Sequence, residues 1–229
     1  ATFTNNATSQ LAVGSVDQNL QRSSFNPDPF FARRQSGFWV GGPIKKDRLF
    51  FFTSLEHNNQ DGVRTILPDS PFFAAHAQSA VEPYTGKQFS QRFDYIINQD
   101  HSLFLRYSHD GNRGFGPIGG GARLPSNWLR NNNWADQSLM GLTSTLRPNL
   151  VSDFRFSYWY WHNRNLFPRE QDCPGCIGLG MPEINVINTN VIMGNTANAT
   201  QGRDLRRFVF SDHMNWQKGT HRFRFGGEF

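Results

Sequence analysis

The chain has 229 residues, of which 14% are aromatic and 18% are charged, with a formal net charge of +5 and a mean hydropathy of −0.58. This composition excludes a disordered chain, because disordered chains are rich in charge and poor in aromatic residues. No run of about 18 apolar residues is present, so the sequence predicts no transmembrane helix. The arginines are scattered along the chain, and we therefore expect no nucleic-acid partner despite the positive charge.

Alternation between apolar and polar residues is the strongest pattern in the chain, and it is typical of half-buried β-strands. In the segment 151–161, for example, Phe154, Phe156, Tyr158 and Tyr160 fall on one face. Turn-forming residues separate such segments in pairs. The sequence predicts eight strands in four hairpins, at 38–43 and 49–56, 89–98 and 102–109, 134–146 and 151–161, and 207–217 and 221–229.

Long connections separate these hairpins, at about residues 57–88, 110–133 and 162–206. Most connections in compact domains have only roughly 4–6 residues. Short turns on one side and long loops on the other, joining strands of about 9–12 residues, are typical of membrane barrels. We therefore predict an all-β fold, an antiparallel transmembrane β-barrel segment of about eight strands with short periplasmic turns and long extracellular loops.

Such a barrel explains how a chain can be both rich in aromatics and polar on average. Its apolar face contacts lipid and its polar face lines a wet lumen. Tryptophan and tyrosine favour the membrane–water interface. Eight of these residues lie near predicted strand ends and are expected at that interface: Trp39, Tyr107, Trp134, Tyr158, Trp159, Tyr160, Trp161 and Trp216. The alternative is a soluble β-sandwich whose aromatic residues form its core.

Five arginines are predicted to share the polar, lumen-facing side of their strands: Arg92, Arg106, Arg155, Arg222 and Arg224. In a lumen they would make a positive field that favours anionic substrates or acidic residues of a plug. The alternative is that they form salt bridges between neighbouring strands.

Cys173 and Cys176 lie in a predicted outer loop, with a spacing that fits a redox pair, half a metal site or a small loop disulfide. The oxidising exterior favours the disulfide. A redox site would need a strand-to-helix context that the sequence lacks. The histidines show no metal-ligand spacing such as HExxH. We therefore predict no catalytic, cofactor-binding or metal-ligating residues, and no enzymatic activity.

One hairpin resembles a known family. The segment 36–56 contains Gly-Gly-Pro-Ile at 41–44, a charged turn, three phenylalanines at 50–52 and Glu56. It resembles a hairpin of Oar-like TonB-dependent outer-membrane receptors. Segments 92–108 and 215–229 resemble later hairpins of that family, so that the resemblance covers roughly residues 30–229.

The resemblance implies a partial barrel in the outer membrane of a Gram-negative-type bacterium, since receptor barrels of this kind have about 22 strands. It implies uptake of a scarce ligand, with outer-membrane lipid, the remainder of the same barrel and its plug as partners. A TonB-type energy-coupling protein would act through an N-terminal part that is not recognisable here. The resemblance makes residues 1–35 an extracellular loop or linker and residues 36–229 the partial barrel.

A second function stays open, that of a structural or adhesive outer-membrane or surface β-protein without transport activity. A chain that continued into many more hairpins and carried a plug would favour the receptor. The identity of the ligand is not readable from these residues.

Overall fold

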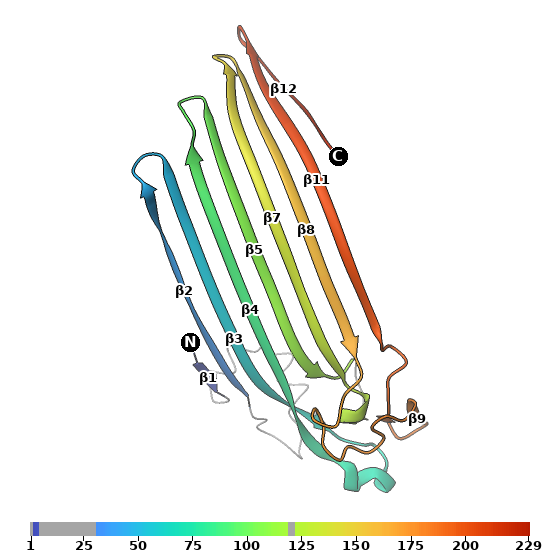
Figure 1. Ribbon diagram of the computed structural model, residues 1–229. Helices are drawn as coiled ribbons and strands as arrows, with labels where there is room; N and C mark the ends of the chain where they lie inside the picture. The colour runs from blue at the N-terminus through green and yellow to red at the C-terminus, as the bar shows by residue number, and fades with distance from the viewer. Residues whose placement is uncertain (1, 5–30, 119–121) are drawn as a thin grey trace.

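A computed structural model describes residues 2–4, 31–118 and 122–229 (Figure 1). Its elements in chain order are β1 (Thr2–Thr4), β2 (Ala32–Lys45), β3 (Leu49–Ile66), η1 (Pro71–His76), β4 (Gln78–Ile96), β5 (His101–Gly116), β6 (Ala122–Arg123), η2 (Pro125–Asn127), β7 (Leu129–Arg147), β8 (Leu150–Leu166), β9 (Ile184–Val186), β10 (Val191–Met193), β11 (Gln201–Lys218) and β12 (His221–Glu228). In this described part, no helix has the length and apolar character needed to cross a membrane.

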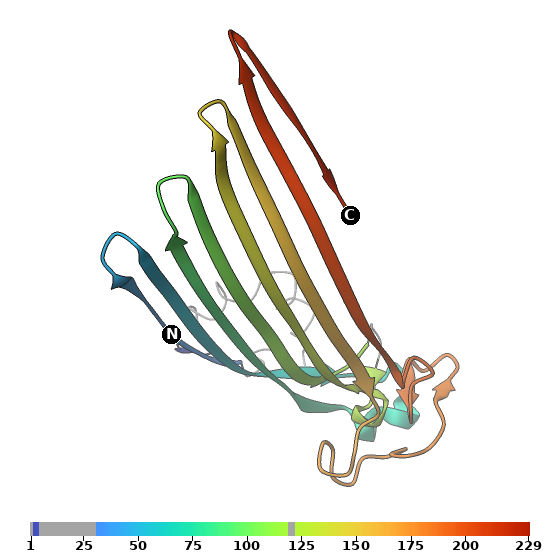
Figure 2. The same ribbon diagram turned by 45° about the horizontal axis from the view of Figure 1, so that its top comes forward.

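The large sheet has nine strands in the order β1-β2-β3-β4-β5-β7-β8-β11-β12, and each neighbouring pair is antiparallel. Eight of them are the eight strands expected from the sequence, so the predicted all-β, antiparallel fold is confirmed. Short turns lie at one end of the sheet and the long loops at the other (Figures 1 and 2). Within the described residues the sheet stays open, with β1 and β12 at its two edges.

The strands run much further toward the loops than expected. β3 and β4, for example, stay paired from Leu49 opposite Tyr95 to Ile66 opposite Gln78. The predicted loops at 57–88, 110–133 and 162–206 are therefore wrong in extent, although each contains a true connection. Beyond the apolar segment both strand faces are polar, so the alternation disappears while the backbone pairing continues.

The N-terminal region also contains strand. β2 begins at Ala32, four residues before the expected barrel boundary, and β1 pairs with Ala32–Arg34. The rest of the expected loop at 1–35 lies mainly outside the described residues.

Residues that pair directly across neighbouring strands share one face of a sheet. One face carries Arg92, Arg106, Arg155, Arg222 and Arg224, and we call it the arginine face. The other carries an apolar row across six strands, which we call the aromatic face: Phe51, Phe93, Leu105, Met140, Phe156 and Phe210. The rings of Phe156 and Phe210 are 4.8 Å apart. Phe93, Leu105 and Phe210 remain exposed, as expected of a face that packs against something other than protein.

The expected belt of interfacial aromatics needs a correction. Trp39, Trp159 and Trp161 lie on the arginine face. A paired row joins Trp39 to Trp159 through Ser90 and Ser108, which are two residues from Arg92 and Arg106, and Trp161 is two residues from Trp159. Consecutive strand residues point to opposite faces, so the aromatic run at 158–161 is divided between the two faces. The other five expected residues lie on the aromatic face.

The long loops pack together into a small core of their own. Ile66, Phe115, Trp128, Cys173 and Val191 are among its buried members, and they come from three different connections or their flanking strands. The Trp128 indole Nε1 donates a hydrogen bond to the Arg123 carbonyl at 2.9 Å. A three-stranded sheet in the order β6-β10-β9 supports this core. The loop end is therefore an ordered layer with its own apolar interior.

Candidate functional site

The strand register places the five predicted arginines on one face. Arg92 on β4 lies directly opposite Arg106 on β5. The register keeps Arg155 of β8 on this face, two residues from Ser157 in the row of Arg106, and likewise keeps Arg222 and Arg224 of β12 on it. Two positive charges directly opposite one another are unfavourable in a sheet. The residues that pair with each arginine therefore decide whether its charge is neutralised or can act on a ligand.

Two of the five arginines pair with a carboxylate two residues away on their own strand. Arg92 binds Asp94 through Nη2–Oδ1 at 2.6 Å and Nε–Oδ2 at 2.8 Å. Arg155 binds Asp153 through Nη2–Oδ2 at 2.9 Å. These pairs lie within a strand, in contrast to the salt bridges between strands that were the alternative.

The other three arginines have no carboxylate partner among the described residues. Arg106 Nη2 donates to Gln137 Oε1 at 3.2 Å, and Arg222 and Arg224 are exposed on β12. Their charge is therefore free to act on a ligand or on another part of the protein. That this face lines a lumen stays a prediction.

A hollow of about 850 Å³ lies along the arginine face. Its wall includes the row from Trp39 through Ser90, Ser108 and Gln137 to Trp159. Hydroxyl and amide groups between two indoles can hydrogen-bond a polar ligand and cover its flat faces.

Cys173 and Cys176 lie in the loop core, where Cys173 is buried and Cys176 is partly buried. Both are free thiols in the structure. Burial is the main cause that raises the pKa of each thiol, which keeps both neutral at neutral pH. The predicted loop disulfide stays a prediction, and sequence reasoning missed that Cys173 is part of an apolar core.

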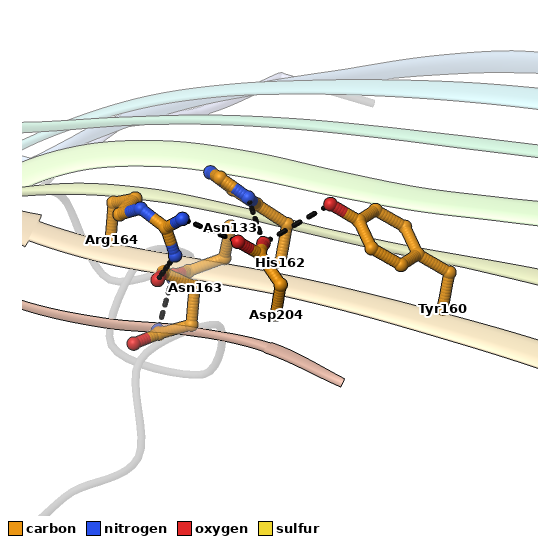
Figure 3. Close-up of polar contacts among 6 residues, drawn as sticks. All are labelled: Asn133, Tyr160, His162, Asn163, Arg164 and Asp204. Atoms are coloured by element: carbon orange, nitrogen blue, oxygen red, sulfur yellow. Dashed lines mark hydrogen bonds and ion pairs between the residues drawn. The ribbon is translucent and has the colours of Figure 1, made fainter. Parts of the chain in front are cut away.

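Sequence reasoning also missed a polar cluster on the aromatic face (Figure 3). Three groups of β8 converge on Asp204 of β11: the Tyr160 hydroxyl at 3.1 Å, His162 Nδ1 at 2.6 Å and Arg164 Nη2 at 2.5 Å. Their alternate spacing along β8 was visible in the sequence. Their pairing with Asp204 was not, because residues 162–206, which include His162, Arg164 and Asp204, were expected in a loop.

On the opposite face at the same level, Asn163 makes a separate contact that does not involve Asp204. The Asn163 amide donates to Asn133 Oδ1 on the arginine face (Figure 3).

Within residues 2–4, 31–118 and 122–229, no group of three or more His, Cys, Asp or Glu residues could hold a metal ion. The expectation of no metal or cofactor site stays an expectation for the whole protein.

Comparison with protein families finds a matching family. A family described as outer membrane beta barrel domain matches residues 65–229, which is more than half of the chain. Comparison with curated proteins and with solved structures finds no match. The match agrees with the long antiparallel strands, the two unlike faces and the asymmetry of turns and loops. The chain therefore belongs to the outer membrane beta barrel domain family and lies in the outer membrane of a Gram-negative-type bacterium.

Proposed function

We propose that the chain is part of the barrel of an Oar-like TonB-dependent receptor that takes up a scarce ligand across the outer membrane. The observation that carries the proposal is the open sheet, whose edge strands β1 and β12 do not pair with each other in the described residues. Unpaired backbone groups are not tolerated in lipid. The sheet therefore needs further strands, as a large receptor barrel would supply.

The hairpin that resembles this family has a physical reason for its glycines. A Cβ atom on Gly37 would lie 2.6 Å from the Leu55 carbonyl oxygen, and one on Gly41 would lie 3.0 Å from the Phe51 carbonyl oxygen and the Phe52 ring. Both positions are on the arginine face of β2, where the backbone approaches β3 closely. These contacts support the resemblance, because two glycines of the matching segment, Gly37 and Gly41, are required by the packing of the same hairpin.

The proposed partners follow from the two edges and the two faces of the sheet. Lipid covers the aromatic face, and further strands of the same barrel cover the two edges. The uncompensated arginines suit an acidic plug surface or an anionic ligand inside the barrel. A TonB-type protein would supply energy through the plug, and we propose no enzymatic activity for the barrel itself.

Cross-linking in living cells tests the proposed function without knowledge of the ligand. A photoreactive amino acid is placed at successive positions in the N-terminal part of the full-length protein, and cross-links to the TonB-type protein are collected. The receptor proposal predicts a cross-link confined to one short segment, and its loss when that segment is deleted. A full-length protein that lacks a plug and forms no such cross-link would contradict it.

The second candidate is a structural or adhesive surface protein, and the loop core is the observation that favours it. Trp128 and Val191 are fully buried there, so the outer layer is a preformed surface of the kind that adhesion uses. A deletion strain that loses attachment to cells or surfaces, but grows normally under every nutrient limitation tested, would favour this candidate over the receptor.

A further inference from the structure

The aromatic face changes character at about one level along the sheet, as four of its strands, β4, β5, β8 and β11, show. Moving toward the loops, Phe89 is followed on this face by Lys87, and Tyr107 by His109. Beyond β7, on β8 and β11, Tyr160 is followed by His162, and Phe208 by Arg206. In an outer-membrane barrel the apolar part of this face lies in hydrocarbon. The level just beyond it, on the side of the extracellular loops, is where lipid headgroups lie.

A hollow of about 500 Å³ opens at this level, with Gly111 at its floor. Lys87 and Trp134 lie directly opposite Gly111 on the two flanking strands, so that they form its walls. His109 and Arg113 lie two residues before and after the glycine on the same strand. A Cβ atom at residue 111 would be 2.9 Å from His109 Nε2 and 3.6 Å from Trp134 Cβ. The hollow therefore depends on the missing side chain of Gly111.

The charge around this hollow is positive. Lys87 is exposed and makes no hydrogen bond or ion pair within the described residues. Arg113 Nε donates to Asn132 Oδ1 at 3.3 Å and has no carboxylate partner in the same part of the chain. The nearby Asp136 is already engaged, because Tyr107 donates to its Oδ1 at 2.6 Å and His109 Nδ1 lies 2.7 Å from the same atom.

The same arrangement recurs on the next two strands. Tyr160, His162 and Asp204 repeat the geometry of Tyr107, His109 and Asp136, with the aspartate directly opposite the histidine in both cases. The two units touch, since the Trp134 ring stacks on the His162 ring at 3.6 Å and 21°. A continuous polar layer thus crosses β5, β7, β8 and β11.

Two further cations border this layer. Arg164 is paired with Asp204, whereas Arg206 lies over the Tyr160 ring at 5.9 Å and has no carboxylate partner among the described residues. The layer holds the tyrosine and histidine rings in place and leaves Lys87, Arg113 and Arg206 available to an anion from outside the protein.

We propose that the hollow over Gly111 binds the phosphate of an anionic lipid headgroup in the outer leaflet of the membrane. Arg113 supplies the planar donor group that matches phosphate oxygens, Lys87 supplies a second charge, and Trp134 covers the adjoining part of the headgroup. The position directly above the lipid-covered part of the same face selects a lipid over a soluble anion. The inference rests on the outer-membrane barrel alone and does not depend on transport.

The test measures retention of lipid by the full-length protein after purification in detergent. Native mass spectrometry records binding of added bisphosphorylated lipid A. The Lys87→Ala/Arg113→Ala variant removes both charges, and Gly111→Phe fills the hollow without changing charge. Each is expected to weaken lipid binding by about tenfold or more. The matched control is Lys45→Ala/Lys46→Ala, which removes two exposed charges at the periplasmic turn and is expected to change binding by less than about twofold.

Three results would overturn the proposal. The first is unchanged binding in both site variants whose circular dichroism shows a folded barrel. The second is an equal loss in the control, which would mean that only net charge matters. The third is equal binding of lipid A without phosphates, or full displacement by millimolar inorganic phosphate, which would point to the acyl chains or to a soluble anion. If no cross-link to the TonB-type protein formed, the lipid-binding result would still stand. The receptor proposal and the lipid-site proposal can therefore be contradicted independently.

Discussion

Phe104 on β5 lies directly opposite Gly141 on β7, and its ring occupies the space that a Cβ atom of residue 141 would need. The guanidinium group of Arg92 also lies over this ring, 4.5 Å from its centroid. The glycine that leaves room for the ring and the cation that lies over it thus explain an aromatic ring on the polar face.

Replacement of Gly141 by leucine is expected to destabilise the barrel by about 1–3 kcal/mol, because the new side chain and the Phe104 ring compete for one space. Unfolding of the full-length protein by urea in lipid bilayers measures this loss. Phe104→Ala in the same protein is expected to recover part of it. The control is Gly42→Leu, since a Cβ atom there meets nothing within 4 Å. Equal losses at 141 and 42 would contradict the explanation.

The charge on Asp94 is expected to compensate the repulsion between Arg92 and Arg106. Asp94→Asn should therefore destabilise the barrel, by up to about 1 kcal/mol because the pair is partly exposed. The loss should shrink in about 1 M salt, where screening weakens the repulsion. Asp61→Asn is the matched control, since Asp61 has no ion pair within the described residues. A loss that does not depend on salt would exclude an electrostatic cause.

The two cysteines are expected to differ in reactivity. Burial raises the pKa of both thiols, and Cys173 is the more buried of the two. A raised pKa lowers the thiolate fraction at a given pH, so alkylation of the reduced, folded protein at mildly alkaline pH should be slow, and slower at Cys173 than at Cys176. Mass spectrometry of the labelled peptides measures both rates. In urea the two rates should become equal.

The same peptides test the loop disulfide. In protein isolated without reductant, the predicted disulfide would join Cys173 and Cys176 and block alkylation of both. Full labelling of both cysteines in such protein, after unfolding, would show that the disulfide is absent.

The loop layer is expected to loosen in acid. Asn127 Nδ2 donates to Glu183 Oε2 at 3.0 Å, and this bond is the main cause that lowers the pKa of Glu183 below its ordinary value of 4.5. A carboxyl group with a lowered pKa in the folded state stabilises the fold above its unfolded pKa, and this contribution disappears as the pH falls through the folded pKa. Limited proteolysis of residues 167–200 below about pH 4 should therefore increase.

Glu183→Gln provides the control for that pH dependence. The variant should be cut faster than the parent at neutral pH, and its cleavage should change less between neutral and acidic pH. A parent protein whose loops resist cleavage equally at both pH values would contradict the role of Glu183.

The alternation of residues such as Phe154, Phe156 and Tyr158 was sufficient to predict the strands, because one face of each strand is apolar where it crosses lipid. It could not predict how far the strands continue. Beyond that segment Asn59 and Thr85 pair directly across two strands, yet their polar character resembles that of a loop. Backbone pairing in that region leaves no periodic signal in the sequence.

The candidate site was predictable to the same degree. The shared face of Arg92 and Arg106 follows from alternation once the strands are paired in register. The partner of His162 does not, because Asp204 lies 42 residues further along the chain and meets it only through the register of β8 and β11. For the same reason, a lone glycine at 111 gave no sign that Lys87 and Trp134 would flank it.

The aromatic face is expected to contact lipid, and the arginine face is expected to border water. Arg155 and Phe156 are neighbours on β8 that lie on opposite faces. Each is replaced in turn by a nitroxide-labelled cysteine in the full-length protein, in bilayers, with Cys173 and Cys176 changed to serine. Collision with dissolved oxygen and with a water-soluble nickel chelate is then measured by electron paramagnetic resonance. We predict that the label at 156 collides mainly with oxygen and the label at 155 mainly with the chelate. Equal access of the chelate to both labels, or the reverse order, would contradict this assignment of the two faces.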